Sequence, residues 1–147
     1  ARSLARWLVR TLYSGAPRGA SRCDVIPNEI TFTRALLIAL SRLPGTRVWR
    51  QNCGSIPVRD ARGRVIRHFD AGPPEGAADI SGITTRGRRL EIELKMPGGK
   101  LREGQRAWAR MVTELGGVYL HVQYNPDLDL DGNVCRAVDH IAEAIAQ

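Results

Sequence analysis

The chain has 147 residues, of which 43% are apolar and 25% charged, which is ordinary for one soluble globular domain. No stretch approaches the roughly 20 apolar residues that a membrane-spanning helix needs, and the N-terminal segment lacks the uninterrupted apolar run and cleavage site of a signal peptide. The three cysteines are scattered without a C-x-x-C spacing. They argue against a disulfide framework or zinc knuckle, and we expect a protein of a reducing, cytoplasmic compartment without a membrane partner.

The charge is unevenly distributed along the chain. Residues 1–110 carry 21 Lys and Arg against 9 Asp and Glu, a net of +12, whereas residues 111–147 carry 1 against 6, a net of −5. A basic body with an acidic end is suited to contact with a phosphate backbone. The alternative is free use of arginine by a GC-rich genome, since 20 of the 22 basic residues are Arg.

The first half of the chain predicts helices, strands and one linker. Apolar residues at helical spacing predict a helix over residues 2–13, and the glycines and proline of residues 14–23 predict a linker. Asn28 is a favourable N-cap for a helix that reaches about Leu43, before Pro44 and Gly45. Residues 47–52 predict a strand, residues 54–63 a turn-rich segment, and residues 64–69 a second strand.

The second half alternates strands and helices. Residues 71–76 form a Gly/Pro-rich loop, and residues 78–83 and 88–96 are the clearest strands. A helix over residues 101–115, a strand over 118–123, an acidic loop over 125–133 and a helix over 134–146 follow. The pattern predicts an α/β fold with a central mixed sheet flanked by helices. We expect one globular domain over residues 24–147, preceded by the N-terminal helix and linker of residues 1–23.

The strand over residues 88–96 carries the candidate chemistry. From Leu90 to Lys95 it alternates perfectly, so Leu90, Ile92 and Leu94 face one side and Glu91, Glu93 and Lys95 the other. The apolar side would pack on a helix. A solvated strand face with alternating Glu and Lys is the alternative for the polar side, and Glu91 fits a peripheral salt bridge there.

The turn before this strand fixes which residue faces Glu93. If Thr85-Arg86-Gly87 is a three-residue loop with Gly87 in the left-handed conformation, Thr84 pairs with Arg88. Counting along the ladder then places Asp79 directly opposite Glu93, with their Cβ atoms about 5 Å apart. A two-residue loop would place Asp79 on the wrong face.

Two carboxylates so close repel each other unless a cation lies between them. Oxygen ligands with room for water suit Mg²⁺ or Mn²⁺. An adjacent ammonium group, as on Lys95, fits phosphodiester hydrolysis, because it can orient a water molecule or stabilise developing negative charge. The spacing therefore indicates a metal-dependent phosphodiesterase.

The wider pattern resembles a known nuclease family. Gly76-x-x-Asp79, Glu93-x-Lys95, Gly98 and Gln105, within the strings GAADISGI and GRRLEIELKMPGGKLREGQRAW, are similar to the VRR-NUC family of the PD-(D/E)XK superfamily. VWRQNCG at residues 48–54 resembles the segment that precedes these motifs in compact, stand-alone members from phages and bacteria. The similarity covers Glu29 to Val122. It departs at Ala78, where the superfamily nominally has proline.

This resemblance implies a restriction-endonuclease-like fold and roles for particular residues. Asp79 and Glu93 would be metal ligands, joined by the Leu94 carbonyl and by Glu29 on the first core helix. Lys95 would be the catalytic lysine, and Gln105 would lie near it.

The implied activity is Mg²⁺- or Mn²⁺-dependent cleavage of DNA. Compact members can act as homodimers on branched DNA such as Holliday junctions, and two-fold symmetry suits symmetric cutting of two strands. Candidate phosphate contacts are Arg50, Arg86, Arg88, Lys100, Arg102 and Arg106. Two alternatives stay open: a non-catalytic DNA-binding or interaction module that uses the same basic surface, and an RNA-processing nuclease.

Overall fold

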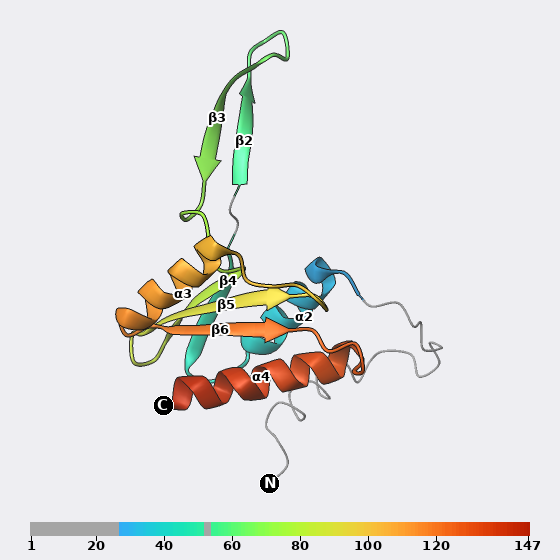
Figure 1. Ribbon diagram of the computed structural model, residues 1–147, viewed down its shortest axis with the longest axis vertical. Helices are drawn as coiled ribbons and strands as arrows, with labels where there is room; N and C mark the ends of the chain where they lie inside the picture. The colour runs from blue at the N-terminus through green and yellow to red at the C-terminus, as the bar shows by residue number, and fades with distance from the viewer. Residues whose placement is uncertain (1–26, 52–53) are drawn as a thin grey trace.

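The computed structural model describes residues 27–51 and 54–147 of the chain. Within these residues, a four-stranded mixed sheet is flanked by three helices, and a separate two-stranded ribbon projects away from them (Figure 1). The predicted mixed α/β class is therefore confirmed. The helix predicted over residues 2–13, the linker after it and the boundary at residue 24 lie outside the described residues.

Helix α2 (Glu29–Leu40) begins where the sequence predicts. The Asn28 side chain accepts a hydrogen bond from the Thr31 N–H at 2.9 Å and so satisfies one of the free donors of the first turn. The helix ends at Leu40 rather than near Leu43, and strand β1 (Thr46–Arg50) follows. The buried hydrophobic residues of α2 are Phe32, Ala35, Leu36, Ala39 and Leu40.

Strands β4 (Ile80–Thr84) and β5 (Arg89–Lys95) form the predicted hairpin. The Thr84 N–H donates to the Arg88 carbonyl at 3.0 Å, which closes the three-residue loop. Gly87 has a φ of 73°, a left-handed conformation that glycine adopts without steric cost. The turn therefore has the length and the glycine position that the sequence indicates.

The register of this hairpin also agrees with the prediction. Ile80 pairs with Ile92 in the antiparallel ladder, so the preceding residue, Asp79, lies opposite Glu93. The Leu94 N–H donates to Asp79 Oδ2 at 2.8 Å, which holds the Asp79 carboxylate against β5. The two carboxylates thus occupy neighbouring strand positions at one end of the sheet.

Helix α3 (Glu103–Glu114) connects β5 to β6 (Val118–Gln123), which runs parallel to β5. Strand β1 pairs antiparallel with β4, so the sheet order is β1-β4-β5-β6. The sheet is mixed because the hairpin joins antiparallel neighbours and the helical crossover joins parallel ones.

The helices cover both faces of the sheet. Helices α2 and α4 (Leu130–Ala146) pack together on the face that carries the even-numbered side chains of β5, and α3 covers the opposite face (Figure 1). The core between α2, α4 and the sheet includes Phe32, Leu36, Ile80, Leu90, Ile92, Leu94, Leu120, Val122, Val134 and Ile141.

Two predicted segments differ from the structure. Residues 54–63 were expected to be turn-rich, but they contain strand β2 (Gly54–Arg59), which pairs with β3 (Val65–Ala71). Pro57 is tolerated because each strand of a two-stranded ribbon is an edge strand. Helix α4 begins at Leu130 instead of residue 134, because the Asp129 side chain caps it by accepting from the Gly132 N–H at 2.8 Å.

None of the helices that the structure describes is long and apolar enough to cross a lipid bilayer.

A close backbone contact fixes the loop before Asp79 against the start of α3. Gly76 has a φ of 95°, and a Cβ added there would lie 2.5 Å from the Gly104 carbonyl oxygen. We expect Gly76→Ala to lower the free energy of unfolding by about 3 kcal/mol in urea denaturation, from backbone strain and overpacking together.

Gly116→Ala is the matched control, since Gly116 has a φ of 80° but no atom of the described residues lies within 4 Å of its added Cβ. The Gly116→Ala variant should lose only the free energy needed to hold alanine in a left-handed conformation, about 1 kcal/mol. Equal losses in the two variants would contradict the importance of the Gly76–Gly104 contact.

Candidate active site

Glu93 lies at the centre of a buried polar cluster. Its side chain is 1% exposed, and its Oε1 accepts hydrogen bonds from Lys95 Nζ and from Gln105 Nε2, both at 2.5 Å. Its Oε2 is buried and has no hydrogen-bond partner among the described residues. A buried carboxylate oxygen without a partner is costly in a folded protein and is therefore a candidate ligand atom.

Gln105 orients this carboxylate from α3. The Gln105 side chain is buried, and its Oε1 accepts from the Arg102 N–H at 2.9 Å. Because the amide oxygen is held by the helix start, the amide nitrogen points at Glu93. The predicted neighbourhood of Asp79, Glu93, Lys95 and Gln105 is thus one cluster.

The pKa of Glu93 is raised above its ordinary value. The main cause is burial, and the nearby Asp79 carboxylate adds to it, while the Lys95 hydrogen bond and the charges of Lys95 and Arg102 act in the opposite direction. The folded state therefore holds this proton more tightly than the unfolded chain does. The associated stability is fully present below the unfolded pKa, near 4.5, and is lost as the pH rises through the folded pKa.

We accordingly expect Glu93→Gln to raise the free energy of unfolding at pH 7–8 in metal-free buffer. The gain should shrink as the pH falls toward 4.5, because the wild-type carboxyl is then neutral as well. Urea denaturation of both proteins across this range, in the presence of a chelator, measures the difference. A variant that is less stable by the same amount at every pH would show that the hydrogen bonds of the charged form outweigh its burial.

The polar face of β5 is covered by protein rather than solvent. Glu91 is 0% exposed, pairs with Arg89 Nη2 at 2.5 Å and accepts from the Ser81 hydroxyl at 2.9 Å. The sequence correctly indicated a salt-bridge role for Glu91 but wrongly placed it at the periphery. The alternative of a solvated Glu/Lys face is also wrong, because α3 packs on that face.

Glu29 lies at the same end of the sheet as the carboxylate pair. Phe32, in the first turns of α2, packs edge-on against Tyr124 with ring centroids 5.2 Å apart, and the Tyr124 N–H donates to the Lys95 carbonyl at 2.8 Å. Glu29 itself is exposed at the start of α2. Its role as a metal ligand, and that of the Leu94 carbonyl, stay predictions.

Four of the six predicted phosphate contacts lie on the elements that adjoin the cluster. Arg50 is exposed at the end of β1, where it pairs with Ile80 beside Asp79. The other three lie at or just before the start of α3, and the charge of one of them, Arg102, acts on Glu93. All four are exposed: Arg50, Lys100, Arg102 and Arg106.

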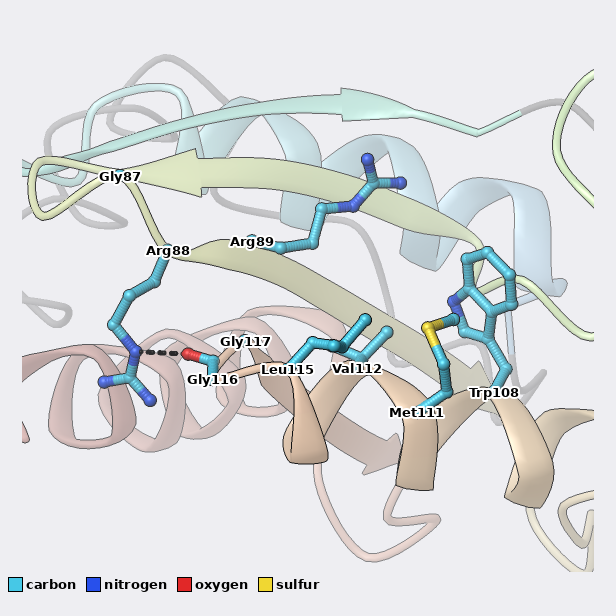
Figure 2. Close-up of a pocket in the computed structure, with 9 residues that line it drawn as sticks. All are labelled: Gly87, Arg88, Arg89, Trp108, Met111, Val112, Leu115, Gly116 and Gly117. Atoms are coloured by element: carbon cyan, nitrogen blue, oxygen red, sulfur yellow. Dashed lines mark hydrogen bonds between the residues drawn. The ribbon is translucent and has the colours of Figure 1, made fainter.

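The other two predicted contacts lie at the opposite end of β5. Arg86 Nη1 donates to the Gln147 carbonyl at 3.0 Å, and Arg88 Nε donates to the Gly116 carbonyl at 2.9 Å (Figure 2). Arg88 is five positions before Glu93, or about 17 Å along an extended strand. The structure therefore does not bring this pair together with the cluster, and their contact with DNA stays a prediction.

A cavity of about 450 Å³ opens at this far end, between α3 and the hairpin (Figure 2). None of the residues of the Glu93 cluster lines it. The lining residues are Gly87, Arg88, Arg89, Trp108, Met111, Val112, Leu115, Gly116 and Gly117.

Two residues of β6 belong to the environment of the cluster. His121 pairs with Glu93 across the parallel ladder, and burial, followed by the charge of Lys95, lowers the pKa of its imidazole. The Tyr119 hydroxyl is buried without a hydrogen-bond partner in the described residues, and burial and the nearby carboxylates raise its pKa. Tyr119 belongs to no recognisable motif, although its alternation with His121 places both side chains on the Glu93 face.

The donor set fits a hard divalent cation. Asp79 and Glu93 offer carboxylate oxygens at opposed strand positions, and Glu93 Oε2 has no hydrogen-bond partner in the described part of the chain. In the part of the chain that the structure describes, no three His, Cys, Asp or Glu side chains gather as a complete metal-binding group. The remaining ligands in this arrangement would be a backbone carbonyl, water or a phosphate oxygen.

No protein-family model matches the chain, and a search of curated proteins finds none that is significantly similar to it.

Proposed function

We propose that this chain is a metal-dependent endonuclease that hydrolyses phosphodiester bonds in DNA, related to the VRR-NUC nucleases. The observation that carries the proposal is the position of Asp79 opposite Glu93, whose Oε1 is paired with the Lys95 ammonium group and whose Oε2 has no hydrogen-bond partner among the described residues. The mixed sheet flanked by helices supports the restriction-endonuclease-like fold expected for such an enzyme. The basic residues around the cluster support a nucleic-acid substrate.

The residues have distinct roles in this proposal. Asp79 and Glu93 would hold Mg²⁺ or Mn²⁺, with the Leu94 carbonyl and Glu29 as further ligands. The bound ion would lower the pKa of a water molecule and offset charge on the phosphate. Lys95 Nζ orients the attacking water or stabilises the negative charge that develops on the phosphate. Gln105 keeps the Glu93 carboxylate in one orientation.

The proposed substrate is branched DNA, cut by a homodimer. The body of the protein offers exposed arginines, but nothing in the sequence suggests a module that reads base edges, so shape and backbone contacts would select the substrate. Two sites related by a two-fold axis would cut two strands symmetrically, as resolution of a four-way junction requires.

The test is cleavage of labelled four-way junction, linear duplex, single-stranded DNA and RNA by the full chain with Mg²⁺, Mn²⁺ or chelator. We expect metal-dependent cutting that is strongest on the junction and absent in Asp79→Asn. Preference for RNA would instead identify an RNA-processing nuclease. Binding without cutting under every metal condition would contradict the enzyme proposal and favour a DNA-binding module.

Metal binding can be measured separately from activity. A ligand that binds only the folded state at ten times its Kd stabilises it by about 1.4 kcal/mol. We expect Mg²⁺ or Mn²⁺ to raise the Tm of the wild type but not that of Asp79→Asn. Equal stabilisation of both proteins would place the ion elsewhere.

A further inference from the structure

Residues 54–71 form an arm that stands apart from the rest of the protein. Strands β2 and β3 pair with each other and with no other described strand, and the ribbon extends away from the sheet and its helices (Figure 1). All the residues from 61 to 70 are exposed. A two-stranded ribbon alone is marginally stable in water, so this exposed arm contributes little to the stability of the fold.

The arm exposes large apolar side chains, two of which form a cross-strand pair. Ile56 lies directly opposite Phe69, and these side chains are 56% and 55% exposed. This cross-strand pair lies on one face of the ribbon. Beyond a register shift between Val58 and Arg59, Val65 and Ile66 are also exposed, at 44% and 62%. Large apolar side chains gathered on an exposed face mark a surface that contacts a partner.

The arm is also basic. Arg59, Arg62, Arg64 and Arg67 stand against Asp60 and Asp70, a net of +2. Asp60 forms an ion pair with Arg64 at 2.9 Å, and the other three arginines have no ion-pair partner among the described residues. Like charges would repel if the arms of two copies packed together, whereas phosphates would be attracted.

The base of the arm adjoins the candidate active site. The chain enters the arm from β1, where the Gln51 N–H donates to the Asp79 carbonyl at 2.8 Å, and leaves it through the loop that leads to Asp79. A polymer bound at Asp79 and Glu93 would therefore lie near the base of the arm.

We propose that the arm is a binding site for branched DNA, with its apolar face on base faces exposed at the branch and its arginines on the flanking phosphates. This proposal rests on DNA being the substrate, as proposed above. Base faces stack favourably on aromatic and apolar side chains, but in a linear duplex they are already stacked on one another. An apolar face therefore favours DNA in which the base stack is interrupted at a branch, whereas arginines alone would bind any duplex equally.

The experiment compares binding of a four-way junction and a linear duplex of the same sequence by the full chain, measured by fluorescence anisotropy in chelator. The apolar variant is Ile56→Thr with Phe69→Thr, which keeps residues that favour strands. We expect it to bind the junction about 10- to 100-fold more weakly and the duplex unchanged. Arg62→Gln with Arg67→Gln should weaken both complexes and reduce the salt dependence by about 2 in slope.

Arg42→Gln is the matched control, because Arg42 is exposed just after the C-terminal end of α2, away from the arm. Junction affinity unchanged in the apolar variant would overturn the proposal, and a lower molecular mass of that variant in light scattering would then identify the arm as a contact between two copies. Wild-type protein that binds no DNA would overturn both this proposal and the proposed function. If the apolar variant lost junction binding but the wild type cut no DNA with any metal, the arm proposal would be supported and the nuclease proposal contradicted.

Discussion

Replacing Lys95 by alanine is expected to lower the rate of DNA cleavage by about 10²- to 10⁴-fold, the range for removal of a group that stabilises charge or directs a proton in a transition state. Lys95 Nζ lies 2.5 Å from Glu93 Oε1, and the side chain is only 17% exposed, so bulk water poorly replaces its charge. Single-turnover cleavage of the preferred substrate, at saturating protein, measures the chemical step.

Two further variants separate the charge from other effects. Lys95→Met keeps most of the side-chain volume, so a loss similar to that of Lys95→Ala would assign the effect to the ammonium group. Arg42→Ala, which removes an exposed basic residue about 20 Å along α2 from the end that lies near Lys95, is expected to cut at the wild-type rate. Wild-type cutting by Lys95→Ala would remove Lys95 from the mechanism.

Glu91→Ala is expected to lower the free energy of unfolding by about 3 kcal/mol without involving the chemical step. The Glu91 carboxylate is 0% exposed and accepts from Arg89, from the Ser81 hydroxyl and from the Ala78 N–H at 3.3 Å. Its removal leaves two buried donors unsatisfied at the start of β4, next to Asp79. The Arg89 side chain is 47% exposed and can turn to water, which limits the loss.

Urea denaturation with matched variants tests this value. Glu91→Gln keeps the volume and one acceptor, so we expect a loss of about 1 kcal/mol. Glu114→Ala removes an exposed acidic residue at the end of α3 and should change stability by no more than about 0.5 kcal/mol. If Glu91→Ala were as stable as Glu114→Ala, the buried carboxylate would contribute nothing to the packing of β4 on β5.

The sequence by itself determined the hairpin that carries the carboxylates. The turn needs only a short loop with Gly87 in a left-handed conformation, and the strand period of two then fixes Asp79 opposite Glu93. The start of α2 was equally local, because Asn28 caps it with its own side chain. In both cases the interacting groups are close in sequence, so the pattern contains the information.

Packing between distant segments was not visible in the sequence. Alternation from Leu90 to Lys95 separates two faces, but it does not say that α3 covers the polar one, which buries Glu91 and Glu93. The hydrogen bonds of Arg86 and Arg88 to carbonyls 61 and 28 residues away likewise depend on how the end of α4 and the turn after α3 meet the hairpin. Burial and long-range pairing are properties of the whole chain.

The arm is a second feature that the sequence did not predict, in this case because its residues are exposed instead of buried. Its two strands lack a buried face, so residues 54–63 gave no alternation that separates a strand from a turn-rich segment. Pairing with β3 determines that β2 is extended. The sequence thus determined the turn and register of the β4–β5 hairpin and the cap of α2. The tertiary structure alone decided which polar groups are buried, which arginines lie near Glu93, and that an apolar, basic ribbon begins beside Asp79.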